Sequence, residues 1–384
     1  MKVLHIVSSI DPQAGGVTQA IKTMIMGLND LQVVNEVVCL DPVGSPFLLE
    51  QPFKIYALGP TKTPWKYSPS LLPWLKNESS GYDFLIVHGL WQYHTYAAYK
   101  AFNGLNGKKP RLFVMPHGML DPYFQKAKGR KLKALRNWFF WKLVEKKLVN
   151  GATGMLFTCE AEKDLATHTF SPYHPKAKLV VGLGVERPPA YHISMTRAFN
   201  EKTNIHEDDY LIFLGRIDQK KGVDLLVKSY LKLLNEKGEL PKLVIAGPGL
   251  DSAFGSEVLA LVNGNKNILF PGMLSGDAKW GAFYGASAFI LPSHQENFGI
   301  AVVEALACGK PVLISDQVNI WNEIKNGNAG IVDHDNETGT YRMLKNWFEK
   351  TTQEKKDMSI FALDTFNLCF SVKNASKSLF DAIK

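Results

Sequence analysis

Short apolar runs recur along the chain, and most are followed by a stretch in which apolar residues return at helical spacing. In the first half these runs fall at 2–9, 35–40, 53–58, 83–88, 111–116, 154–158 and 178–183. Strands that alternate with helices are typical of a mostly parallel sheet with helices on both faces. The pattern therefore predicts an α/β domain over residues 1–190.

The alternation lapses over residues 186–209, where two prolines precede scattered polar residues and an acidic cluster, Glu207 to Asp209. We interpret this stretch as a linker. A second series of apolar runs follows at 210–215, 242–246, 268–271, 287–291, 311–314 and 329–332. It predicts a second α/β domain over residues 205–365, and from about Ser359 the chain continues in two helical patterns.

The stretch 291–311 combines apolar and acidic positions. A strand ends at its start, a polar loop follows, and a helix is predicted over about 298–308. That helix is apolar nearly all round, so Glu304 in its middle is costly unless something binds it. Glu296 lies in the loop ahead, where the backbone N–H groups of Asn297–Gly299 suit hydroxyl or phosphate oxygens. One ligand could touch both carboxylates; the alternative is a structural helix in which Glu304 pairs with a Lys or Arg.

Two cations follow the strand predicted at 210–215. Arg216 leaves the end of that strand, and Lys221 stands just before a helix that begins near Val223. Such a pair beside a helix N-terminus can clamp a diphosphate, because charge-assisted hydrogen bonds to phosphate are strong. The alternative is two solvated loop cations.

These segments together resemble the retaining family 4 glycosyltransferases, the glycosyl transferases group 1. Gly215, Arg216, Lys221 and Gly222 match the family pattern, as do the two glutamates that flank Phe298-Gly299, and the segments 244–249 and 268–273. The resemblance implies the GT-B fold, with two Rossmann-like α/β/α domains facing across a cleft and a last helix, about 368–384, crossing back to the first domain. One departure is the stretch Val318 to Glu323, where the family usually has a glycine pair.

The resemblance also implies roles for individual residues. It implies a catalytic set of His117, Arg216, Lys221 and Glu296, and a donor-binding set of Gly15, Gly16, Gly215, Met273, Leu274, Asn297, Phe298, Gly299, Ile300 and Glu304. Arg216 and Lys221 would stabilise the leaving phosphate, Glu304 would hold ribose hydroxyls, and Glu296 would hold the hexose. No metal and no cofactor are expected beyond the nucleotide sugar.

The first half carries weaker signals. Gly15 and Gly16 follow a strand and begin a helix, where backbone can approach an anion or simply form a tight turn. His117 and His88 each stand at the end of a predicted strand, a place where histidine is more often structural than catalytic. The resemblance favours His117, near the donor sugar, and gives no support to His88.

The net charge of +8 is concentrated in one segment. Between Lys126 and Lys147 nine basic residues face one acid, Glu145; the basic positions are 126, 128, 130, 131, 133, 136, 142, 146 and 147. Aromatic and aliphatic residues interleave with these charges over a helical pattern from Arg130 to Val149. This predicts either an interfacial helix on an anionic membrane or a surface helix packed on its own domain. No recognised nucleic-acid module accompanies the segment, so no nucleic-acid partner is expected.

The apolar runs and the cysteines indicate the cellular compartment. No apolar run reaches the length of a membrane span, and the N-terminal apolar stretch is too short for a signal peptide. The four cysteines match no metal or redox spacing and have apolar neighbours in the sequence. We expect a cytoplasmic protein, or one that is peripheral on the inner face of the plasma membrane.

The resemblance then implies a function. We expect a retaining, metal-independent hexosyltransferase that uses a UDP- or GDP-sugar and a glycan or lipid-linked acceptor in bacterial surface polysaccharide synthesis. The alternatives are a nucleotide-sugar epimerase or hydrolase of the same fold, and a membrane-surface protein with a degenerate donor site.

Overall fold

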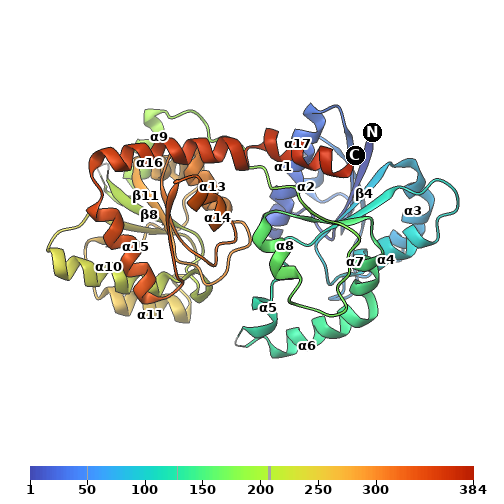
Figure 1. Cartoon of the computed structure of the whole chain (residues 1–384), viewed down its shortest axis with the longest axis horizontal. Coiled ribbons are helices and arrows are strands. Elements are labelled where there is room, and N and C mark those ends of the chain that lie inside the picture. The colour runs from blue at the N-terminus through green and yellow to red at the C-terminus, as the bar shows by residue number, and fades with distance from the viewer. Residues whose placement is uncertain (50, 128, 206–208) are drawn as a thin grey trace. The chain divides into compact units, whose positions relative to one another are not determined.

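The computed structural model describes residues 1–49, 51–127, 129–205 and 209–384. They form two units: Met1–Gly184 together with Val372–Lys384, and Val185–Ser371 (Figure 1). Two acids of the predicted cluster, Glu207 and Asp208, and one cation of the basic segment, Lys128, lie outside the described residues. We describe each unit by itself.

Unit 1 is built on a seven-stranded sheet in which every neighbouring pair is parallel. The order is β3-β2-β1-β4-β5-β6-β7. The strands are β1 (Lys2–Ile6), β2 (Val34–Pro42), β3 (Lys54–Gly59), β4 (Phe84–His88), β5 (Arg111–Met115), β6 (Gly154–Phe157) and β7 (Lys178–Val180). Each coincides with an apolar run in the sequence, because central parallel strands are buried on both faces and read as nearly continuous apolar stretches.

Helices cover both faces of this sheet (Figure 1). On one face α1 (Gly16–Asp30) and α17 (Val372–Ile383) pack on the strands, and on the other face lie α3 (Leu71–Glu78), α4 (Tyr93–Asn103) and α7 (Lys146–Gly151). The remaining helical elements are η1 (Pro12–Ala14), α2 (Pro46–Leu49), η2 (Ser79–Gly81), α5 (Tyr123–Lys126), α6 (Lys131–Phe140), the π-helical η3 (Trp141–Glu145) and α8 (Glu160–Ala166).

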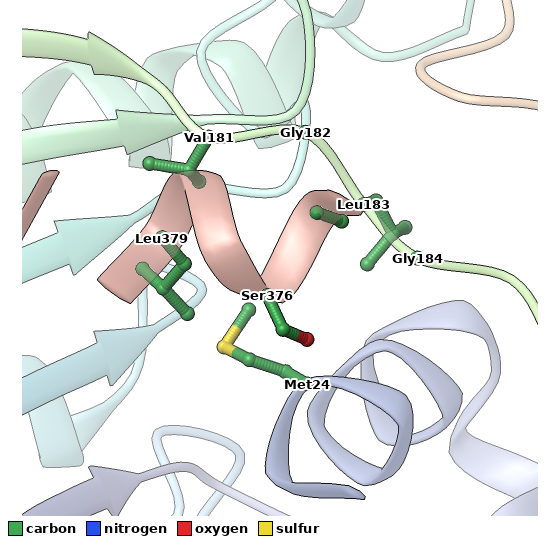
Figure 2. A pocket seen from close by; sticks show the side chains of 8 residues that line it. Met24, Val181, Gly182, Leu183, Gly184, Ser376 and Leu379 are labelled. Atoms are coloured by element: carbon green, nitrogen blue, oxygen red, sulfur yellow. The ribbon is translucent and has the colours of Figure 1, made fainter. Parts of the chain in front are cut away.

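The C-terminal helix α17 belongs to unit 1, which confirms that the chain crosses back to its first domain. It packs beside α1 so closely that a Cβ at Gly27 would overlap Ser376. Figure 2 shows the small cavity left between Met24, Leu379 and the chain at 181–184. The apolar face of α17 completes the core on that side of the sheet.

Unit 2 repeats the architecture with six parallel strands in the order β10-β9-β8-β11-β12-β13. They are β8 (Tyr210–Leu214), β9 (Leu243–Ala246), β10 (Ile268–Leu269), β11 (Ala286–Leu291), β12 (Val312–Ser315) and β13 (Gly330–Asp333). The helical elements are α9 (Ile193–Thr203), η4 (Gln219–Lys221), α10 (Val223–Lys237), α11 (Ala253–Val262), α12 (Gly276–Gly285), α13 (Ile300–Ala307), α14 (Trp321–Asn326), α15 (Glu337–Glu349), α16 (Thr352–Thr365) and the π-helical η5 (Phe366–Phe370).

The predicted linker differs from the structure. Much of it forms α9, which buries Met195 and Phe199 and packs on α12, and the change from unit 1 to unit 2 falls at Gly184–Val185. The paired prolines and polar residues concealed this helix, because its apolar positions are few and widely spaced.

Candidate functional site

The two loops that carry the predicted catalytic residues of unit 2 lie side by side. Strands β8 and β11 are parallel neighbours, so the loops that follow them leave the same edge of the sheet. Arg216 and Lys221 belong to the loop after β8, and Glu296 belongs to the loop after β11. Ligands of open parallel sheets bind beyond the carboxyl ends of strands, which is the edge these residues occupy.

Lys221 and Glu296 form an ion pair across the two loops. Their side chains are 16% and 20% exposed, so both can still be reached from solvent. The neighbouring Lys220 carbonyl accepts a hydrogen bond from the His294 N–H at 2.8 Å and from the Ser293 hydroxyl at 3.0 Å. The backbone contacts hold the two loops together independently of the ion pair.

Glycine is required where these loops meet. Gly222 is the N-cap of α10 with φ of 66°, and a Cβ there would collide with the Pro292 carbonyl. Gly247 has φ of 147° and lies against the Gly215 carbonyl, again without room for a side chain. Both positions therefore combine a left-handed backbone with close approach of another chain segment.

Arg216 is exposed, and the described residues offer its guanidinium no hydrogen-bond or ion-pair partner. The predicted clamp thus consists of one free cation and one cation held by Glu296. The structure records no direct contact between Arg216 and Lys221.

Glu304 has a partner that the sequence did not identify. It lies on α13, and Lys279 of α12 donates a hydrogen bond from Nζ to its Oε1 at 2.6 Å. The carboxylate is also not fully enclosed, with 15% of the side chain exposed. Glu304 is therefore compensated by a cation, and the pairing with a lysine that the sequence left open as the alternative is present.

Helix α13 begins at Ile300, two residues later than the sequence suggested. Gly299 is its N-cap with φ of 77°, and its carbonyl accepts the N–H groups of Val302 and Val303. Within the described chain, the N–H groups of Phe298, Gly299 and Ile300 have no acceptor. They are available for ligand oxygens at the positive end of the helix dipole.

Backbone hydrogen bonds hold the loops that follow β10 and β12. After β10, Leu274 is buried and Met273 is exposed, and the Gly272 carbonyl accepts the N–H of Gly247 at 2.9 Å. The loop after β12 contains Val318 to Glu323, the stretch that departs from the family pattern. There the Asn319 N–H donates to the Glu296 carbonyl at 2.9 Å. That loop therefore supports the Glu296 backbone, although it lacks the glycine pair.

In unit 1, Gly15 and Gly16 lie where expected, between β1 and α1. Gly15 has φ of 99° and caps α1, and no atom lies near the position a Cβ would take. The turn is thus open on the side where a side chain would project.

His117 follows β5 in a left-handed conformation with φ of 51°, which is rare for a residue with a side chain. Gly118 donates its N–H to Glu162 at 2.5 Å, which anchors the turn. Burial lowers the pKa of His117 to about 4, so the ring is neutral near pH 7. Its Nε2 lies 3.0 Å from Nδ1 of His88, so the histidine that sequence reasoning set aside contacts the one it selected.

A pocket of about 220 Å³ opens near these histidines in unit 1. Its polar lining comes from Ser8, Ser9, Thr18, Lys66, Gln92, His88 and His94. Lys66 is half-buried and has no acidic partner among the described residues, and Nδ1 of His94 is buried without a hydrogen bond. The pocket therefore offers both a cation and an unused acceptor nitrogen.

The basic segment is helical from Lys131 to Gly151, through α6, η3 and α7. Five large apolar side chains project into solvent among its charges: Leu132 (84% exposed), Leu135 (54%), Trp138 (47%), Phe139 (51%) and Leu143 (67%). The alternative in which this whole stripe packs on its own domain is therefore wrong, although Trp141 and Leu148 do enter the core.

Residues 1–49, 51–127, 129–205 and 209–384 contain no cluster of three His, Cys, Asp or Glu side chains arranged to hold a metal. None of the helices in these ranges has the length and apolar character needed to cross a bilayer. All four cysteines are free, and Cys369 is exposed, in contrast to the apolar setting expected for it.

Sequence reasoning missed the contacts of Lys279, Lys66 and His94. Lys279 stands on a short helix with no motif, and only its distance to Glu304 reveals it. Gln92 and His94 lie after strand β4, and their residue types alone did not single them out.

Comparison with known proteins supports this reading of the second half. Residues 195–360 match the family model described as "Glycosyl transferases group 1", which confirms the resemblance. An uncharacterized glycosyltransferase of Methanocaldococcus jannaschii is 27% identical over 185 residues, covering 44% of this chain and 47% of the relative. The O-antigen chain mannosyltransferase C of Escherichia coli is 25% identical over 195 residues, half of each chain. This chain thus spans about half the length of the curated relatives it matches.

A solved structure extends the likeness to both units. HepE of Anabaena, crystallised with UDP and glucose, superposes with a TM-score of 0.70 at 15% identity, covering 100% of this chain and 99% of that one. At this identity the likeness shows the fold alone. Two Rossmann-like units with this strand order confirm the GT-B fold.

Proposed function

We propose, from the match of residues 195–360 to the group 1 glycosyltransferases, that this protein is a retaining glycosyltransferase. It moves a hexose from a UDP- or GDP-sugar to a glycan or lipid-linked acceptor. The observation that carries the proposal is the Lys221–Glu296 ion pair together with Arg216, which has no partner among the described residues, at the carboxyl edge of two neighbouring strands.

The cations suit the charge that the reaction develops. Breaking the bond between a sugar and a nucleoside diphosphate leaves negative charge on the phosphate, and fixed positive groups stabilise that charge before solvent can reorganise. Arg216 is free for this role. Lys221 becomes available when a ligand hydroxyl replaces it on Glu296, so one binding event satisfies both halves of the ion pair.

The carboxylates suit the sugar and ribose hydroxyls. Glu296 and the N–H groups of Phe298 to Ile300 accept and donate hydrogen bonds at one point, which matches the hydroxyl pattern of a hexose. Glu304, which pairs with Lys279, would accept hydrogen bonds from ribose hydroxyls. Gly15, Gly16 and His117 are proposed to contribute from unit 1, and Gly215, Met273 and Leu274 through their backbone.

We propose that the reaction needs no metal and no cofactor. Two cationic side chains and a helix N-terminus already supply the positive charge that a divalent ion supplies elsewhere. Retention of the anomeric configuration would follow from attack by the acceptor on the face from which the diphosphate departs.

The acceptor is proposed to enter the pocket lined by Lys66, Gln92 and His94. The exposed apolar residues of the basic segment favour a membrane-bound acceptor, because basic charges and apolar side chains on one helix bind anionic lipid surfaces. We therefore propose a peripheral enzyme on the inner face of the plasma membrane that acts in surface polysaccharide synthesis.

The test is binding, measured by calorimetry and thermal shift against UDP, GDP, ADP, UDP-glucose and GDP-mannose, first without metal and then with Mg²⁺. A saturable response to one nucleoside diphosphate that Mg²⁺ does not change supports the proposal and assigns the base. Absence of a binding response to every one of these nucleotides would contradict the proposal. Stoichiometric release of free UDP without acceptor would instead indicate the epimerase or hydrolase alternative.

A further inference from the structure

A row of polar side chains crosses the core of unit 1 from β2 to His117. Asn35 Oδ1 lies 3.1 Å from His5 Nε2, His5 Nδ1 lies 3.0 Å from His88 Nε2, and His88 Nδ1 lies 3.0 Å from His117 Nε2. Three imidazoles in series are unusual inside an otherwise apolar sheet core. We call these four residues the histidine relay.

Strand register explains why these residues meet. Asn35 of β2 pairs with Val3 of β1 in the strand register, and His5 lies two residues further along β1. His5 is level with Ile86, and His88 stands two residues further along β4. Each step to the next strand therefore advances the row by two residues, which keeps every side chain on the same face.

The last step of the row obeys the same rule. His88 is level with Met115 on β5, and His117 stands two residues beyond it. The row thus runs diagonally over β2, β1, β4 and β5, which are consecutive in the sheet, and it ends at the carboxyl edge.

The amide of Asn35 determines which ring nitrogen of each histidine donates a hydrogen bond. Its Nδ2 donates to the Val33 carbonyl and to Asn29 Oδ1, both at 2.9 Å. A backbone carbonyl can only accept, so this contact assigns the amide nitrogen and leaves Oδ1 facing His5. His5 must therefore donate from Nε2, which makes its Nδ1 the unprotonated nitrogen.

The tautomer of His5 in turn fixes the tautomers of His88 and His117. Because His5 Nδ1 accepts, His88 must donate from Nε2 and accept at Nδ1. His117 must then donate from Nε2, and its own Nδ1 carries a lone pair. The described residues provide no partner for that nitrogen.

The surroundings keep all three rings neutral, as this argument requires. His5 and His88 are at most 1% exposed. Burial lowers the pKa of His5 and of His117 to about 4, and it lowers the pKa of His88 well below its ordinary value. A second contact holds the His88 backbone, whose carbonyl accepts from His94 Nε2 at 2.9 Å.

We propose that Asn35, His5 and His88 are positioning residues that hold His117 in the Nε2–H tautomer, so that Nδ1 accepts a hydrogen bond from a substrate hydroxyl. The tautomer assignment follows from unit 1 alone. The substrate hydroxyl rests on the proposed glycosyl transfer. A hydroxyl donor is the ligand class that a bare, neutral imidazole nitrogen selects.

The first experiment reads the tautomer in the unmodified protein. Long-range ¹H–¹⁵N correlation spectra of protein labelled at histidine distinguish a bare from a protonated ring nitrogen, and substitution of single histidines assigns the ten residues. We expect His117 to show protonated Nε2 and bare Nδ1 in the absence of ligand. A protonated Nδ1, or a mixture of tautomers, overturns the relay whatever the enzyme does.

The second experiment breaks the relay at a residue that does not touch His117. In His5→Leu the His88 ring loses its acceptor, so His117 should populate both tautomers, and kcat/KM should fall about tenfold, the factor carried by one hydrogen bond. His5→Gln can accept from His88 and donate to Asn35, so it should restore both readouts. His174→Leu, at an exposed histidine outside the row, is the matched control.

The outcomes separate the relay from the proposed function. If His5→Leu leaves the His117 tautomer unchanged, or changes it without lowering kcat/KM, the positioning role is wrong. If His5→Leu does not fold, the spectrum of the unmodified protein and the activity of His5→Gln still decide. Failure of every nucleotide to bind overturns the glycosyltransferase proposal and leaves the tautomer measurement as the test of the relay.

Discussion

The Nζ of Lys279 lies 2.6 Å from Oε1 of Glu304, and the two side chains are 21% and 15% exposed. The carboxylate inside α13 is therefore compensated by a cation from α12. A nucleotide that uses Glu304 must share it with Lys279 or displace that lysine, so donor affinity and protein stability are linked at this contact.

Glu304→Gln should weaken donor binding about tenfold, because a neutral amide accepts ribose hydroxyls less strongly than a carboxylate does. Lys279→Met should leave donor binding at least as strong, because the competing cation is gone, and should lower the free energy of unfolding by about 1 kcal/mol, since Glu304 is left without that cation. Calorimetry and urea denaturation measure the two effects. Lys345→Met, at the exposed Lys345–Glu349 pair, is the control. Loss of donor binding in Lys279→Met would make the lysine itself part of the ligand site.

Arg216→Ala should lower kcat by ~100-fold or more, the scale for loss of one charge-stabilising group in the transition state. Binding of the nucleoside diphosphate should weaken less, because Lys221 and the α13 N-terminus remain. Steady-state kinetics with the donor assigned by calorimetry measure the change. Arg197→Ala, at an exposed arginine of α9, should leave the rate unchanged. An unaltered rate in Arg216→Ala would falsify the phosphate clamp.

Glu145 should make stability depend on pH. Burial raises its pKa to about 7 from 4.5, and its Oε2 has no partner among the described residues. The folded protein therefore binds more protons than the unfolded chain between pH 4.5 and 7, so the contribution of this group to stability falls as pH rises through that interval. Glu145→Gln still accepts from the Trp91 N–H and the Thr95 hydroxyl but does not ionise.

The difference in unfolding free energy between Glu145→Gln and the unmodified protein should therefore grow by roughly 3 kcal/mol from pH 4.5 to above pH 7. Urea denaturation across this range measures it. Glu201→Gln, at an exposed glutamate, should show no such trend. A constant difference at every pH would mean that Glu145 stays ionised in the folded protein.

The basic segment should bind anionic vesicles. Replacing Lys131 and Lys133 by Glu should weaken that binding by at least about 2 kcal/mol, at about 1 kcal/mol for each lysine near the surface. Cosedimentation with vesicles containing phosphatidylserine, at two salt concentrations, measures the effect. The matched reversal of Lys237 and Lys356, which lie in unit 2, should leave binding unchanged. Equal binding by both double variants would place the contact elsewhere.

Much of the fold could be predicted because its signals are local. Every strand coincides with an apolar run, and the loops that carry Arg216, Lys221 and Glu296 were recognisable from glycines and charges at short spacing. The expectation that α13 would begin near Phe298 was off by two residues, since a buried loop residue and a buried helix residue are equally apolar. Helix α9 was missed for the related reason that its apolar positions are sparse.

The sequence by itself determined the two α/β units and the family that the second half matches, since these depend on periodicity and on motifs within a few residues, and the resemblance to that family implied the return of the last helix. Only the tertiary structure decided which groups meet across those elements. Lys279 reaches Glu304 from another helix, and His5, His88 and His117 are separated by 83 and 29 residues but joined by strand register. Side-chain exposure along the basic helix was decided in the same way, because the pattern of Leu132 to Leu143 is compatible with burial until the packing surface is known.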